Sequence, residues 1–197
     1  MKDIFFNNTK KNEYLKGNPF FHSNKVNPPE KGIKKLIELF QNNQFVCAEQ
    51  LAISITNQFP NHLFARKLLG VVSKRLGKID EALNNMQKSV KLEPNDPENY
   101  HNLAITLTEV GRFREAISCY AKVIALNPQC AEAYNNLGFT FNKIGRFREA
   151  VSSYNQAISI SPCFKEAYYN LGITLVEMNK IEDALSIYKK VIFLNPH

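Results

Sequence analysis

The residues of this chain that could perform chemistry are few and lie far apart in the sequence. Its cysteines form no CxxC pair and have no histidine at metal-ligand spacing. A nucleophilic Cys119 would need a base beside it, and the sequence predicts none. The residues considered are His22, His62, His101, His197, Cys47, Cys119, Cys130 and Cys163. We therefore predict that the protein is not an enzyme, needs no cofactor or metal, and carries reduced thiols, as in the cytoplasm.

The formal net charge of +7 is concentrated at the start of the chain. Residues 1–35 carry a net +5, which leaves only +2 for the rest, where acids and bases alternate. This distribution does not predict a nucleic-acid partner. Four arginines in two GRFREA segments could form a rim for an anion, or could be solvated charges paired with Glu115 and Glu149. They are Arg112, Arg114, Arg146 and Arg148.

A period of 34 residues runs through most of the sequence. Proline recurs at positions 60, 94, 128, 162 and 196, and an alanine stands twelve residues before each of them. Further columns share this step. They are Leu69, Leu103, Leu137 and Leu171, each followed by Gly or Ala; the aromatics Tyr100, Tyr134 and Tyr168; and the aromatics Tyr120, Tyr154 and Tyr188. Several columns with one period indicate a structural repeat.

Each repeat has the pattern of two antiparallel helices. Apolar residues spaced i, i+3 and i+7 form a stripe in the first half of a repeat, and residues spaced i, i+4, i+7 and i+8 form the matching stripe in the second half. We expect Gly138 of a first helix to face Ala150 and Ala157 of the second. Turn residues in the left-handed conformation should end the first helices, and the prolines should end the second helices. The expected turn residues are Asn43, Gly77, Gly111, Gly145 and Asn179.

No single pair can bury its apolar face alone, so neighbouring pairs must stack. We predict an all-α, right-handed superhelical solenoid of about five helix-turn-helix repeats. Its units are 29–62, which is degenerate, 63–96, 97–130, 131–164 and 165–197. Residues 1–28 show no period. We expect an irregular basic segment there, with Phe5, Phe6, Phe20 and Phe21 lying on the first unit.

First-helix residues outside the core stripe should line a concave groove. An asparagine amide both donates and accepts, so repeated asparagines can hold the backbone of an extended peptide; the alternative is that they are ordinary surface residues. The predicted groove residues are Lys67, Lys74, His101, Asn102, Asn135, Asn136, Phe139, Asn142, Tyr169 and Asn170, with Arg75, Glu109, Lys143, Ile173 and Glu177 beside them.

The pattern aromatic-x-x-Leu-Gly, then Ala-x-x-x-Tyr, then Pro resembles the tetratricopeptide repeat family over residues 29–197. This resemblance implies an interaction scaffold with a protein or peptide partner. The segment AEAYNNLGFTFNKIGRFREAVSSYNQAI is similar to repeats of O-linked N-acetylglucosamine transferase and of bacterial glycosyl- and sulfotransferases. In those proteins an asparagine ladder holds peptide backbone, and the matching residues here are Asn102, Asn136 and Asn170. Leu68 and Lys34 interrupt the ladder in the first two units.

Another binding mode of the family, the two-carboxylate clamp for acidic peptide ends, does not match. Val71 stands where the clamp needs an asparagine, and Glu132 and Asn136 stand where it needs a lysine and an arginine. We predict that this clamp is missing.

The last unit should leave an apolar strip of Leu185, Tyr188 and Ile192 exposed. The chain could be part of a longer protein, dimerise through this end, or have it covered by a partner. The leading hypothesis is a cytoplasmic, non-catalytic scaffold that binds a peptide. The alternatives are a substrate-recruiting arm of a longer glycosyl- or sulfotransferase, and self-assembly through the C-terminal end. No stretch of the sequence predicts a membrane span or a signal peptide.

Overall fold

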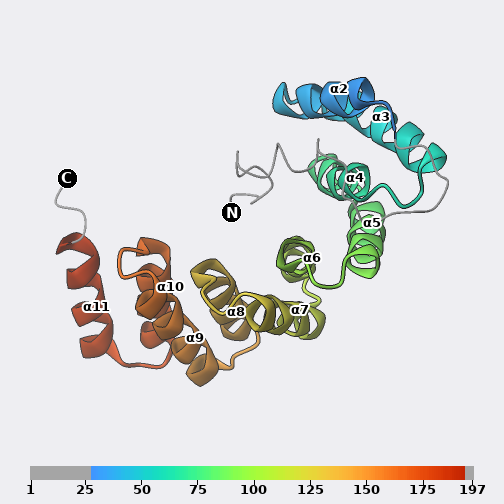
Figure 1. Ribbon diagram of the computed structural model, residues 1–197. Coiled ribbons are helices and arrows are strands. Elements are labelled where there is room, and N and C mark those ends of the chain that lie inside the picture. The colour runs from blue at the N-terminus through green and yellow to red at the C-terminus, as the bar shows by residue number, and fades with distance from the viewer. Residues whose placement is uncertain (1–27, 194–197) are drawn as a thin grey trace. The chain divides into compact units, whose positions relative to one another are not determined.

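The computed structural model describes residues 28–193, and every regular element in that range is a helix. The helices follow one another in antiparallel pairs (Figure 1). Their bounds are α2 Glu30–Gln41, α3 Phe45–Gln58, α4 Leu63–Arg75, α5 Ile79–Leu92, α6 Pro97–Glu109, α7 Phe113–Leu126, α8 Ala131–Lys143, α9 Phe147–Ile160, α10 Lys165–Glu177 and α11 Ile181–Phe193. The expectations for residues 1–27 and for the last four residues lie outside the described range.

The helix ends lie where the repeat predicted them. Each of the first four repeat prolines follows the last residue of a second helix by two positions. All five predicted turn residues have positive φ: Gly77, Gly111 and Gly145 at 73–77°, Asn43 at 56° and Asn179 at 59°. Glycine and asparagine adopt this left-handed conformation at the least steric cost, so these positions stop the first helices.

The described chain divides within α6, between Asn102 and Leu103, into two compact units. Unit 1 comprises α2 to α5 and the start of α6. Its core is formed by apolar residues of α2, α3 and α4, and Leu36 and Leu68 are fully buried in it. Leu36 thus fills the position where other repeats have a small residue, so the degenerate first repeat still packs.

Unit 2 comprises the rest of α6 and α7 to α11. Its core includes Ala150, Tyr154, Leu171, Leu175 and Ala184, which come from α9, α10 and α11. Burial of Tyr120 and Tyr154 and of the whole repeated alanine column confirms that these residues are core. Tyr188, which was expected in an exposed strip, is half-buried. None of the described helices is both long and apolar enough to cross a membrane.

The packing around Gly138 involves an aromatic ring as well as the small residues that were expected there. The three atoms nearest to a Cβ added at Gly138 all belong to the Tyr154 ring, the closest at 2.7 Å. Gly172 faces Tyr188 in the same way. In unit 2 the glycine of a first helix therefore makes room for an aromatic ring of the second helix, which a spacing argument based on small residues alone did not predict.

Candidate protein-interaction site

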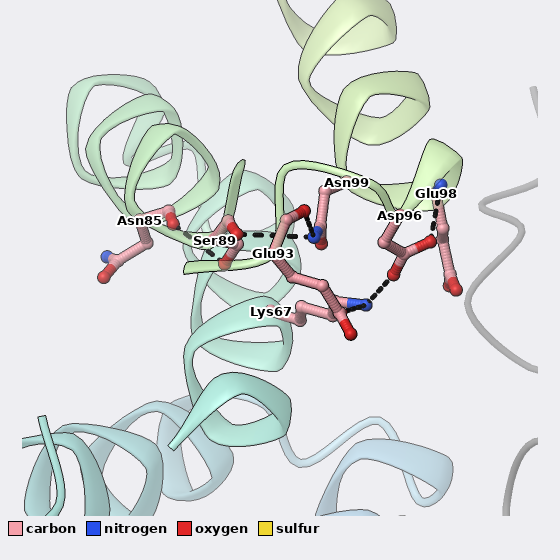
Figure 2. Close-up of polar contacts among 7 residues, drawn as sticks. All are labelled: Lys67, Asn85, Ser89, Glu93, Asp96, Glu98 and Asn99. Carbon is pink, nitrogen blue, oxygen red and sulfur yellow. Dashed lines mark hydrogen bonds and ion pairs between the residues drawn. The ribbon is translucent and has the colours of Figure 1, made fainter. Parts of the chain in front are cut away.

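In unit 1, the predicted groove residue Lys67 is a buried structural cation. Its Nζ contacts the Asp96 carboxylate and lies 3.6 Å from Glu93 Oε2 (Figure 2). Asp96 also accepts a hydrogen bond of 3.0 Å from the Glu98 backbone N–H, at the start of α6. A buried ammonium needs such partners because its desolvation is costly. Lys67 therefore ties α4 to the loop that leads into α6.

Asn99 strengthens the same junction, and the sequence analysis missed it. Its Nδ2 donates to the carbonyls of Ser89 and Glu93 at 3.3 and 3.2 Å (Figure 2). These carbonyls lie at the end of α5, and each also accepts a backbone N–H, from Glu93 onto Ser89 and from Asp96 onto Glu93. The signal was present in the sequence, because three of the other repeats have a buried alanine at this position, namely Ala65, Ala133 and Ala167.

The other predicted residues of unit 1 differ in exposure. His101 is buried, and burial lowers the pKa of its imidazole to about 4, so the ring is neutral near pH 7. Asn102 keeps 9% of its surface exposed. Lys74 is half-buried and Arg75 is exposed. A ligand on this helix face would therefore meet Lys74 and Arg75 more readily than Lys67 or His101.

In unit 2, predicted groove residues bind one another. Asn170 Nδ2 of α10 donates to Asn135 Oδ1 of α8 at 3.0 Å, and Asn135 Nδ2 donates to Glu166 Oε1 of α10 at 3.3 Å. Asn135 is buried, whereas Asn170 is half-buried and Glu166 is exposed. These side chains therefore join α8 to α10, and of the two asparagines Asn170 is the more accessible.

A second kind of side-chain hydrogen bond between first helices recurs in unit 2. Thr108 Oγ1 lies 3.1 Å from Thr140 Oγ1, and Asn142 Nδ2 lies 3.0 Å from Thr174 Oγ1. Both contacts join a first helix to the residue 32 positions later in the next first helix. The sequence analysis missed the fully buried column Thr106, Thr140 and Thr174, although its 34-residue step was visible.

The accessible side chains on the first helices of unit 2 are both apolar and polar. Phe139 is half-buried, and Lys143 Nζ lies 5.0 Å from its ring centroid. Tyr169 is 57% exposed. Asn142 and Asn170 are half-buried, whereas Asn136 keeps only 7% of its surface exposed. A ligand could thus reach aromatic rings and two amides, but only part of Asn136.

Cys119 is not an activated nucleophile, and two of the arginines of the GRFREA segments are paired with glutamates. Burial raises the pKa of the Cys119 thiol to about 11, and the Glu115 charge adds to the rise. A nucleophilic cysteine requires the opposite shift. Arg112 and Arg146 pair with Glu115 and Glu149 at 2.8 and 2.7 Å, which supports the interpretation of these arginines as solvated charges at helix starts. Within residues 28–193, no group of three or more His, Cys, Asp or Glu side chains could hold a metal.

Comparison with known proteins identifies the class. Family models described as tetratricopeptide repeat match residues 68–96, 97–162 and 153–186, together more than half of the chain. The chain belongs to the tetratricopeptide repeat family. Members of this family are chiefly interaction scaffolds, and the chain is a protein-interaction scaffold of that kind.

Solved structures support the same fold class. The match to a crystal structure of MamA has a TM-score of 0.78 at 24% sequence identity, and it covers 84% of this chain and 90% of the MamA chain. MamA from Desulfovibrio magneticus RS-1 has a TM-score of 0.80 at 18% identity, covering 85% and 94%. YrrB, described as a tetratricopeptide repeat protein with an unusual peptide-binding site, has a TM-score of 0.74 at 21% identity, covering 98% and 93%. No curated protein matches the sequence. The predicted all-α superhelical repeat fold is thereby confirmed.

Proposed function

We propose that the chain binds an extended peptide or an extended segment of a partner protein. Asn136 and Asn170 are the proposed backbone anchors in unit 2, and Asn102 is the proposed anchor in unit 1. Lys74 in unit 1 and Phe139, Asn142 and Tyr169 in unit 2 would contact side chains of the ligand. The buried Lys67, His101 and Asn135 would act indirectly, by holding the helices and the anchors in place.

The observation that carries this proposal is the arrangement around Asn170. Its amide uses one N–H on Asn135, which fixes the orientation of the side chain. A half-buried amide held in this way can accept a hydrogen bond from a peptide N–H without losing much rotamer freedom. Tyr169 stands beside it in the sequence and is 57% exposed, and its ring centroid lies 6.3 Å from that of Tyr188. An aromatic side chain exposed to this extent is suited to packing against a ligand.

The test uses a phage-displayed library of random 12-residue peptides, selected on the wild-type protein. Affinities of the selected peptides are then measured by fluorescence anisotropy for the wild type and for the Asn102→Ala/Asn136→Ala/Asn170→Ala variant. Each backbone hydrogen bond contributes about 1 kcal/mol, so we expect the triple variant to bind at least about tenfold more weakly.

Asn155→Ala is the matched control, because Asn155 is an exposed asparagine of a second helix. It should leave the affinity unchanged, and circular dichroism should show native helix content in both variants. A folded triple variant with wild-type affinity would contradict the assignment of the anchors. A library that yields no binding peptide would contradict the proposed function.

A second function, self-association, is favoured by apolar exposure on the last helix pair. Leu185 is 54% exposed, whereas Val151, at the same position one repeat earlier, is half-buried against the core of unit 2. Val176 and Ile181 of this pair are also exposed. The proposed occupant is a second copy of the chain, which would cover these side chains with a helix face of its own.

Light scattering over a dilution series tests this second function. We expect the apparent mass of the wild type to fall on dilution, and Leu185→Lys to be monomeric at every concentration. Ser186→Lys adds the same charge at the neighbouring exposed position and should associate like the wild type. A wild type that is monomeric throughout the series would exclude self-association through this face.

A further inference from the structure

Three exposed charges alternate along unit 2 at the same position of successive repeats. They are Glu109, Lys143 and Glu177, the last residues of α6, α8 and α10. The C-terminus of a helix carries partial negative charge, which favours a lysine there and disfavours a glutamate by about 0.3–1 kcal/mol. Two glutamates at helix C-termini thus oppose helix stability, which makes a stabilising role a poor explanation for the pattern.

The three helix ends are tied together by hydrogen bonds. The Thr108–Thr140 contact joins the end of α6 to α8, and the Asn142–Thr174 contact joins the end of α8 to α10. Glu109 directly follows Thr108 and Lys143 directly follows Asn142, whereas Glu177 stands three residues after Thr174, so each charge lies near one of these contacts. Packed helices lie about 8–10 Å apart, and the charges should follow at about that spacing.

Two of the three charged side chains are also held in place. Asn142 Nδ2 donates to the Glu177 carboxylate, and Lys143 Nζ lies over the Phe139 ring. A charge that is held before binding loses less conformational entropy when a partner pairs with it. This arrangement suits recognition better than a freely rotating surface charge does.

We infer that the partner segment carries alternating charges, with basic, acidic and basic side chains spaced about three residues apart, which meet Glu109, Lys143 and Glu177. The spacing follows because an extended chain in the polyproline II conformation advances about 3.1 Å per residue and completes a turn every three residues, so side chains three positions apart lie on one face about 9 Å from each other. This inference rests on the proposed peptide binding and specifies its ligand. A uniformly acidic segment would face two glutamates, and a uniformly basic one would face the lysine, so each would be disfavoured by like-charge contact.

The peptides selected on the wild type give the first readout. We expect enrichment of peptides with an acidic residue flanked at about three positions by Lys or Arg. The same library is then selected on Lys143→Glu, where all three charges are negative, and we expect peptides in which the acidic residue is replaced by a basic one. Lys122→Glu, the same charge change at an exposed site on a second helix, should select the wild-type pattern.

Charge compensation gives the second readout. Binding of a wild-type-selected peptide to Lys143→Glu should be about tenfold weaker, and replacing the acidic residue of the peptide by lysine should restore most of the affinity. Misfolding of the variant cannot produce such recovery. Peptides that bind without this charge pattern, or variants that compensation does not rescue, would overturn the inference and leave the proposed function standing. Failure to select any peptide would instead count against the proposed function.

Discussion

Lys67 shows how a single residue of a repeat can change from a binding role to a structural one. Its position on the first helix suits a groove residue, but the loop that follows α5 places Asp96 and Glu93 around its ammonium group. Lys67 is buried and the Asp96 side chain is 12% exposed, so water screens this ion pair weakly. Removal of either partner would leave a poorly solvated charge.

We predict that Lys67→Met lowers the free energy of unfolding by about 3 kcal/mol, because it leaves the Asp96 carboxylate without its cation. Urea denaturation followed by circular dichroism measures the change. Lys34→Met is the control, since the pair that Lys34 forms with Glu30 is 61% exposed on both sides, and it should change stability by less than about 0.5 kcal/mol. Equal effects of the two substitutions would show that the buried pair contributes no special stability.

His101 makes stability depend on pH. Burial lowers its pKa in the folded state to about 4, whereas the unfolded value is about 6.5. The unfolded chain therefore binds a proton first, and stability falls as the pH drops from about 6.5 towards 4. Between pH 7.5 and 5 we expect His101 to account for a loss of about 2 kcal/mol. His101→Gln should remove this part of the loss in urea titrations at both pH values; an unchanged slope would contradict it.

At the scale of the element, the glycines of the first helices differ in what they face. Gly138 of α8 lies against the ring of Tyr154, which is almost completely buried and cannot move aside. A Cβ added at Gly70 of α4 would lie 3.0 Å from Met86 Cγ. A methionine side chain is flexible and can move to relieve this contact. The same small residue is thus required in one helix and replaceable in the other.

We predict that Gly138→Ala destabilises the protein by about 1 kcal/mol, because overpacking against Tyr154 exceeds the gain in helix propensity. Gly70→Ala should be neutral or stabilising by up to about 1 kcal/mol, since the propensity gain remains and the contact can relax. Thermal and urea unfolding of the two variants provide the comparison. A reversed order of stabilities would mean that the Tyr154 ring has room to move.

Helices and turns could be predicted because they depend on local rules that every repeat restates. The prolines, the left-handed Gly and Asn residues and the apolar stripes were sufficient to place them. The partners of polar side chains could not be predicted in the same way. Asn99, Asn135 and Thr140 make contacts that depend on the distance between elements, which the spacing of residues within a repeat does not specify.

At the scale of the whole molecule, the repeat predicted the fold class more fully than the site. The family matches and the solved structures agree with an all-α repeat scaffold. The structure divides the predicted groove residues into buried and accessible ones, since Lys67, His101 and Asn135 are buried while Tyr169 is exposed. A sequence column shows which helix face a residue shares, but burial depends on the neighbouring repeat, whose residues at that position vary.

The hydrogen bonds between α8 and α10 also bear on how such an array could grow. In a chain with the fourth 34-residue unit present twice in tandem, Asn135 of the first copy would meet Glu132 and Asn136 of the second, the same residue types that it contacts now. Asn142 would keep a threonine partner but meet Lys143 where a glutamate now stands. Gene duplication could therefore lengthen this stretch with one polar mismatch per added unit, and circular dichroism of a duplicated chain should show a proportionate increase in helix signal.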